Sequence, residues 1–324
     1  MELFRQPNID WLGRKWYFLS FSLIFSVAGI LSLLFWHHLP LGVDFKGGTH
    51  ITVAYTTPPN EDHVREALVK AGIRDAQIQR ISPVGSAGGN SVSNQEVIAL
   101  PESTATDANH DAGRTAVENA LKSNYKDSGF EVLQVDIVGP TAGKQLQKQA
   151  IYATIYSLVG MLAYLWFRFE LIYGVAAVVA VFHDTLITIG AFSLTNQEIT
   201  LTVIAAILTL IGYSMNDTVV VFDRIRENLA TSRRETLSEV VNRSINQTLS
   251  RTVLSSGLTF LTVMSLFLFG GEVLHGFSFA LVVGILIGTY SSIAVAAPML
   301  VAWTDYRAKQ GKAAATLPAG RARA

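Results

Sequence analysis

Long apolar runs dominate the pattern of hydrophobic and polar positions along the chain. A helix needs about 20 apolar residues to cross the hydrocarbon core of a bilayer, and each run is close to that length. The pattern therefore predicts six membrane-spanning helices. They lie at Trp16–Trp36, Ile151–Phe167, Leu171–Leu194, Ile199–Phe222, Thr252–Phe269 and Gly276–Trp303.

The segment between the first two runs, residues 39–149, has the pattern of a small folded domain. Stretches with period 2 predict strands and stretches with period 3.6 predict helices. Asn60 is the predicted N-cap of its first helix, and Gly72 the stop. The order strand, helix, strand, strand, helix, strand favours an α+β ferredoxin-like fold. The predicted strands are 49–55, 77–81, 95–100 and 130–138, the predicted helices are 60–71 and 109–125, and a Gly/Ser-rich loop at 85–93 is predicted to be mobile.

Composition supports a membrane class. Half of the 324 residues are hydrophobic and 15% are charged, which is too apolar for an ordinary soluble domain of this length. The first run is too long for a signal-peptide core and is interpreted as a retained anchor. The absence of Cys excludes disulfides and thiolate metal sites.

The distribution of Lys and Arg predicts the orientation. The N-terminal segment carries Arg5, Arg14 and Lys15, the Arg-rich loop 224–251 carries six Arg, and further basic residues follow Arg307. The turns 195–198 and 270–275 carry none. By the positive-inside rule both termini are cytoplasmic, and the domain lies outside the cytoplasm.

These boundaries divide the chain into four parts. Residues 1–38 are a cytoplasmic N-terminus and the first helix, and residues 39–149 form the extracytoplasmic domain. Residues 150–305 hold helices two to six, and residues 306–324 are a cytoplasmic tail that we expect to be disordered.

Asp217, in the fourth run, is the leading candidate for function. An ionisable group at the centre of a membrane helix costs about 2.5–3.5 kcal/mol on insertion scales, so it needs a reason to be there. It either titrates during a transport cycle or bonds a polar group on a neighbouring helix. Gly212 and Asn216 share one helical face, which permits close packing beside the carboxylate.

The third run carries His183 and Asp184 near its middle. Adjacent helical residues point about 100° apart, so we expect each of the two to face its own partner. Asp184 either joins a proton path or anchors its helix through Thr or Asn partners, and His183 is interpreted as structural. Arg251, at the cytoplasmic mouth of the fifth run, either snorkels to the interface or lies against Asp217 and tunes its protonation.

The sixth run has a small residue at every fourth position, which predicts a close helix-packing seam. A weaker seam is predicted in the fifth run at Ser255, Thr259 and Thr262. The members of the first seam are Gly276, Ala280, Gly284, Gly288, Ser292 and Ala296.

The sequence has no signature of an enzyme or of a nucleic-acid-binding protein. It lacks HExxH, GxSxG, a Walker loop and any Cys/His cluster, so no catalytic residue and no metal ligand is predicted. Its Arg-rich segment is already explained by membrane topology.

Several runs resemble the SecD/SecF family of protein export membrane proteins, within the resistance-nodulation-division superfamily. The most specific is GYSMNDTVVVFDRIREN at 212–228. Supporting matches are GVDFKGGT at 42–49, His183-Asp184, and NQTLSRT at 246–252, although Lys46 and His50 depart from the family pattern.

The resemblance implies an accessory subunit of the Sec translocase whose six helices pair with six of the sister subunit SecD in the bacterial inner membrane. The implied function uses the proton or sodium motive force, with no cofactor, to promote late steps of polypeptide export. Asp217 is then the membrane carboxylate and Arg251 its basic partner. The further implied partners are the SecYEG translocon, YajC, YidC, the unfolded polypeptide and the lipid bilayer.

Two other classes remain open at this stage. One is a half-transporter that exports a small molecule or lipid. The other is a membrane-embedded hydrolase that uses Asp184 and Asp217, for which the sequence lacks a supporting motif.

Overall fold

Six long apolar helices form the core of the molecule. The computed structural model describes residues 7–36, 38–73, 76–81, 94–101, 112–125, 127, 129–169, 171–232 and 234–309. Six candidate membrane spans lie in these ranges, which confirms the predicted number. The helices of the spans are α1 (Lys15–Leu31) with its π-helical end η1 (Ser32–Trp36), α5 (Pro140–Arg168), α6 (Leu171–Thr195), α7 (Leu201–Thr231), α8 (Leu237–Phe269), and α9 (Glu272–Ser291), which continues through the π-helical turn η3 (Ser292–Ala296) into α10 (Ala297–Lys309).

Three of these helices, α5, α7 and α8, extend well past the predicted runs. The Arg-rich segment 224–251 is helical up to Thr231 and again from Leu237, and is not a loop as the sequence suggested. Thr236 and Glu239 form a capping box that starts α8. The apolar run ends where side chains become polar, but backbone hydrogen bonds continue the helix regardless of side-chain polarity.

The segment between α1 and α5 folds as predicted into a ferredoxin-like α+β domain. Its antiparallel sheet has the strand order β2-β3-β1-β4, and α3 and α4 contact each other. The side chains of Ile51, Val53 and Tyr55 in β1 are buried against the helices. Asn60 accepts from the Asp62 amide and caps α3, and Gly72 after that helix has φ of 88°. The elements are α2 (Val43–Lys46), β1 (Gly48–Tyr55), α3 (Glu61–Lys70), β2 (Gln77–Ile81), β3 (Gln95–Pro101), α4 (Ala112–Asn124) and β4 (Phe130–Val138).

An exposed contact joins α3 to the residues that follow α4. His63 Nδ1 in α3 lies 2.5 Å from Asp127 Oδ2, beyond α4. The hydrogen bond to Asp127 raises the pKa of His63 above its ordinary value. The pair therefore contributes its full stability below the pKa of an unfolded histidine, and the contribution is lost as the pH rises through the folded pKa.

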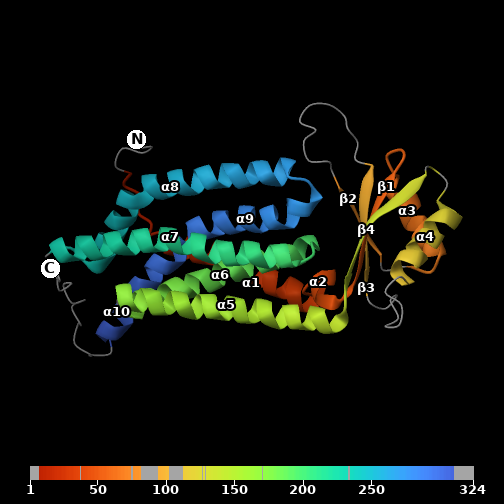
Figure 1. Cartoon of the computed structure of the whole chain (residues 1–324). Coiled ribbons are helices and arrows are strands. Elements are labelled where there is room, and N and C mark those ends of the chain that lie inside the picture. Colours follow the sequence, from red (N-terminus) through yellow and green to blue (C-terminus); the bar gives the residue numbers. More distant parts are fainter. Residues whose placement is uncertain are drawn as a thin grey trace.

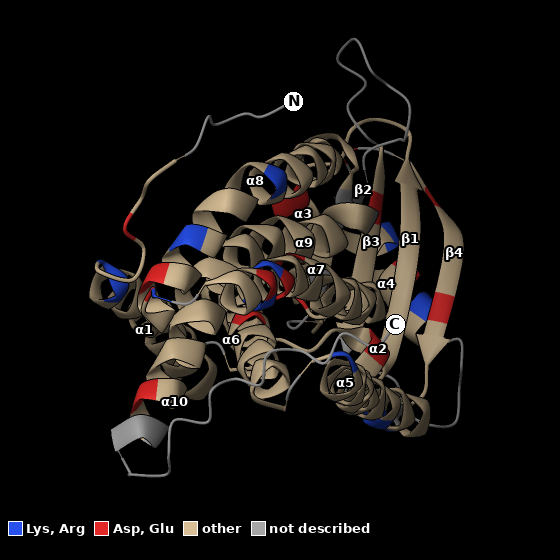
Figure 2. Cartoon of the chain, turned by 90° about the vertical axis from the view of Figure 1, so that its left-hand side faces the viewer, with Lys and Arg blue, Asp and Glu red and all other residues tan. Residues whose placement is uncertain are grey.

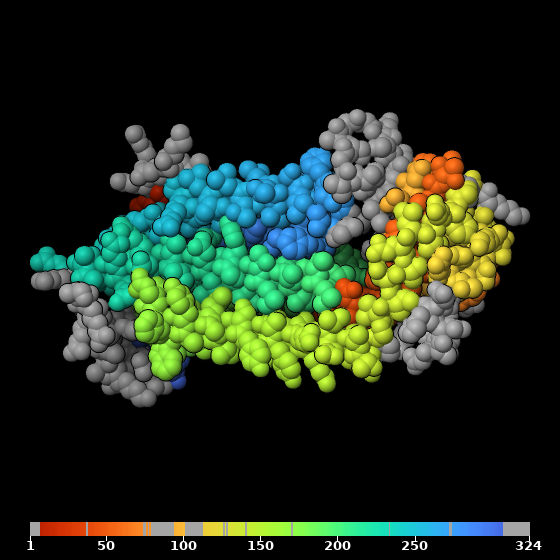
Figure 3. Space-filling model, in the orientation of Figure 1, coloured from red at the N-terminus to blue at the C-terminus, as the bar shows by residue number. Residues whose placement is uncertain are grey.

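The domain lies at one end of the elongated bundle (Figures 1 and 3). The start of α1 and the end of α10 lie at the other end, where the ribbon is coloured for Lys and Arg positions on α1, α7 and α8 (Figure 2). The loop predicted at 85–93 and the tail beyond Lys309 fall outside the described residues.

Candidate functional site

Asp217 is buried where α7 faces α8. Its side chain is 2% exposed. Its carboxyl Oδ2 accepts a hydrogen bond from Ser256 Oγ of α8 at 2.6 Å, and Ser256 is the one hydrogen-bond partner it has among the described residues. A buried carboxylate normally needs several donors to replace water. A single hydroxyl donor leaves most of the hydrogen-bond acceptor sites of the Asp217 carboxylate unused.

Asp184 in α6 has a different environment. It is 1% exposed, and its Oδ2 accepts from Ser214 Oγ of α7 at 2.6 Å and from Ser291 Oγ of α9 at 2.7 Å. Hydrogen bonds to a charged group contribute about 1.5–3 kcal/mol each. The geometry is that of an anchor that joins three helices, with Ser as partners and not the Thr or Asn partners expected from the sequence.

The expectation that His183 and Asp184 face separate partners is wrong. His183 Nδ1 lies 3.0 Å from Asp184 Oδ1. The Cα–Cβ bonds of neighbouring helical residues diverge, but both side chains are long enough for their outer atoms to meet along the helix surface. His183 is therefore the hydrogen-bond partner of the second carboxylate oxygen of Asp184.

The small residues of the sixth span face α7. A Cβ added at Gly276 would stand 3.1 Å from Val203 Cγ2, and one added at Gly288 would stand 3.1 Å from Ser214 Cβ. A Cβ at Gly284 would overlap the side chain of Leu210. This close approach brings Ser291 and Ser214 to the same carboxylate. Ala280 and Ser292, also in the predicted seam, are fully buried.

A second face of α7 points out of the bundle. Asn216 is exposed, and a Cβ added at Gly212 would meet no atom within 4 Å. Ser255 and Thr262 of α8 are exposed too, and each hydroxyl bonds to a carbonyl of its own helix. We call these four residues, together with Thr209, the outer polar face.

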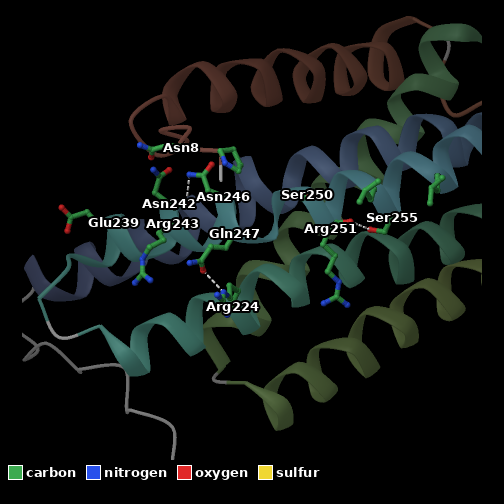
Figure 4. A pocket seen from close by; sticks show the side chains of 13 residues that line it. Asn8, Arg224, Glu239, Asn242, Arg243, Asn246, Gln247, Ser250, Arg251 and Ser255 are labelled. Carbon is green, nitrogen blue, oxygen red and sulfur yellow. Dashed lines mark hydrogen bonds between the residues drawn. The ribbon is translucent and has the colours of Figure 1, made fainter. Parts of the chain in front are cut away.

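Arg251 lies on α8 at the edge of this face. Its side chain is exposed and attracts Asp217 electrostatically, but among the described residues it forms no direct ion pair with that carboxylate. It lines a cavity of about 1240 Å³ together with Arg224 and Arg243 (Figure 4). Arg224 Nε donates to Gln247 Oε1 at 2.6 Å across the gap between α7 and α8. Three Arg and one Glu, Glu239, are among its lining residues, and Arg224 and Arg243 are paired with Glu227 and Glu235.

Comparison with known proteins decides the family. The profile described as "Protein export membrane protein SecD/SecF, C-terminal" matches residues 116–306, and that of the "SecD/SecF GG Motif" matches residues 37–59. The protein translocase subunit SecF of Koribacter versatilis is 49% identical, with 99% of this chain and 98% of the relative covered. The chain belongs to the SecF family. The SecF of Rhodothermus marinus is 41% identical over 93% of this chain and 95% of its own length.

The solved structures agree with this membership. The crystal structure of SecDF, a translocon-associated membrane protein from Thermus thermophilus, superposes with a TM-score of 0.78 at 35% identity and covers 92% of this chain. The chain spans 39% of that SecDF chain. Members of the SecF family are inner-membrane subunits of the protein translocase, with a role in transport.

Sequence reasoning missed the hydroxyls that hold the two carboxylates. Ser214, Ser256 and Ser291 carry no signal of their own in spans that are rich in Ser and Thr. It also missed the crossing of α1 and α6, where a Cβ on Gly190 would stand 2.7 Å from Gly29 Cα. Only a prediction of which helices are neighbours would have found these contacts.

Proposed function

We propose that this chain, paired with SecD, uses a proton or sodium gradient to promote late steps of polypeptide export. The observation that carries the proposal is the contrast between the two buried carboxylates. Among the described residues Asp184 has three hydrogen-bond partners, whereas Asp217 has one. Asp217 therefore exchanges a proton or cation at the loss of few hydrogen bonds, and Asp184 holds the helices in place while it does so.

The gradient supplies enough energy for this role. One elementary charge that crosses the whole membrane potential gains about 2.3 kcal/mol per 100 mV. That is more than a tenfold bias on a conformational equilibrium for each ion. Asp217 would carry the charge, with Arg251 and Asn216 beside its path.

The outer polar face supports pairing with SecD. An exposed amide side chain such as that of Asn216 is unfavourable against lipid, whereas small and polar residues favour contact between membrane helices. The face also lies beside Asp217, so a partner that covers it would close the ion path from the other side.

We expect Gly212→Leu to abolish pairing with SecD without unfolding the chain. The new side chain would project from the outer polar face, where nothing in this chain meets it. Gly160→Leu is the matched control, because Gly160 of α5 is equally open but lies on a different face. Co-purification with tagged SecD measures the effect. Equal recovery of SecD with both variants would remove this face from the interface.

In the proposed orientation both termini are cytoplasmic and the ferredoxin-like domain is outside. The chain has no Cys, so a single introduced cysteine reports its side without interference. A membrane-impermeant maleimide added to intact cells, made permeable only at the outer membrane, should label Ser123→Cys in α4 and leave Ser238→Cys in α8 unlabelled. Both positions are exposed. The reverse labelling pattern would show that the chain has the opposite orientation in the membrane.

The remaining proposed partners are the SecYEG translocon, the accessory proteins YajC and YidC, and the unfolded polypeptide. The experiment that tests the function combines this chain and SecD with SecYEG in vesicles and measures release of a translocating precursor, with and without an imposed gradient. Gradient-dependent release supports the proposal. Precursor release that does not depend on the gradient, together with gradient-driven movement of a lipid or small molecule, would favour the half-transporter instead.

A further inference from the structure

The GG-motif segment after α1 is hydrogen-bonded to the start of α7, the helix that carries Asp217. Ile199 N donates to the Pro40 carbonyl at 2.7 Å, and Gly42 N donates to the Ile199 carbonyl at 2.9 Å. Leu41 and Ile199 form a parallel β-bridge between these two bonds. Two segments about 160 residues apart in sequence are thus joined as one short piece of sheet.

Asp44 adds a side-chain contact to this junction. Its Oδ2 accepts from the Leu201 amide, the first residue of α7, at 2.9 Å. The first amides of a helix have no partner within the helix, and a negative charge there is favoured by the helix dipole. Thr200 already caps the Val203 amide of α7, so Asp44 supplies a second cap from a distant part of the chain.

The same segment is fixed to α5 and to the sheet. A Cβ on Gly143 of α5 would stand 2.8 Å from the Phe45 carbonyl, so α5 crosses α2 at backbone contact. Phe45 is 4% exposed and belongs to the apolar core of the bundle. Two residues after Phe45, Gly47 has φ of 83° and leads into β1, the inner strand that pairs with both β3 and β4. The left-handed backbone at Gly47 is unfavourable for any other residue type.

We infer that the segment 40–48 is a rigid joint that transmits movement between α7 and the extracytoplasmic domain, with Asp44 as its positioning residue. From Leu201 to Asp217 the helix rises about 24 Å at 1.5 Å per residue. A tilt or shift of α7 on ion exchange at Asp217 would therefore reach the sheet through Asp44 and the β-bridge. This inference rests on the proposed function, because it requires Asp217 to be the ion site.

The test separates coupling from ion flow in vesicles that hold this chain, SecD and SecYEG. Asp44→Ala removes the cap and should lower gradient-stimulated precursor release about fivefold, the factor that a loss of about 1 kcal/mol of coupling corresponds to. Ion flux should persist. Asp44→Asn keeps an oxygen that accepts from Leu201 N, so it should retain most of the stimulation. If Asp44→Ala loses both ion flux and precursor release, or if its precursor release is normal, the inference of a joint is wrong.

A second variant tests rigidity directly and does not depend on the stability of Asp44→Ala. Leu41→Cys with Ile199→Cys places two cysteines at bridged positions, in a chain with no other Cys. A rigid joint tolerates the disulfide, so oxidised and reduced vesicles should export equally. Export that stops on oxidation and returns on reduction would show that the two segments separate during the cycle, and would contradict the inference. If Asp217→Asn leaves gradient-dependent release intact, the proposed function fails first, whatever the joint variants do.

Discussion

Asp217→Asn should abolish gradient-dependent stimulation of polypeptide release while the protein inserts and pairs with SecD normally. Asn keeps the size of Asp and an oxygen that accepts from Ser256 Oγ, but it cannot ionise. The change therefore separates exchange of a charge from packing. In the vesicle assay, release in the presence of the gradient should fall to the level seen without it. Because Asp184 remains bonded to Ser214 and Ser291, the helix bundle should keep its thermal stability.

Three further variants show whether Asp217 has only a structural role. A structural carboxyl would be replaced well by Asn and poorly by Leu, which leaves Ser256 without its acceptor. Ser256→Ala should alter the ion dependence of release while some stimulation remains, because the carboxylate is still present. Asp184→Asn should instead lower stability, because it weakens three contacts at once. An Asp217→Asn protein with full stimulation would remove Asp217 from the ion path.

Gly284→Leu should cause the largest loss of stability among the helix-packing positions. A Cβ at Gly284 already overlaps the Leu210 side chain, and a whole Leu side chain would force α9 away from α7. Overpacking of a closed core costs about 1–3 kcal/mol and occasionally more. Separation of the two helices would also pull Ser291 from Asp184, so we expect the upper end of that range. Folded yield and thermal unfolding in detergent measure the effect.

The control for this variant uses both sides of the contact. Gly160→Leu adds the same side chain at an open position and should leave the unfolding temperature nearly unchanged. Combination of Gly284→Ala with Leu210→Ala should destabilise the protein by less than the sum of the two single changes, because the second change empties the space that the new methyl group needs. Equal unfolding temperatures for Gly284→Leu and Gly160→Leu would show that the seam does not determine packing.

Period and length of the apolar runs were sufficient to predict the helices and the fold of the domain. The six spans and the order of strands and helices along the domain follow from patterns that repeat within each element. The ends of α7 and α8 did not follow, because their last turns are polar and look like a loop. Neither did the junction between the GG-motif segment and α7, since residues 41 and 199 meet only once the bundle is assembled.

The candidate site was predictable in its charges but not in its contacts. Asp217 and Asp184 are conspicuous because carboxylates are rare in apolar spans. Their different roles come from Ser256 on one side and from Ser214 and Ser291 on the other, and these are tertiary contacts. The contact of His183 with Asp184 was not expected, because the directions of the two Cβ atoms do not account for the length of the side chains.

Ion flux through the complex tests the central claim most directly. Vesicles that contain this chain, SecD and SecYEG, with a precursor held in the channel, are given a membrane potential, and proton or sodium uptake is followed with an ion-sensitive dye. We predict that the wild-type complex takes up one of the two ions and that Asp217→Asn takes up neither, with SecD bound equally in both. Equal uptake by the wild-type and Asp217→Asn complexes would contradict the account.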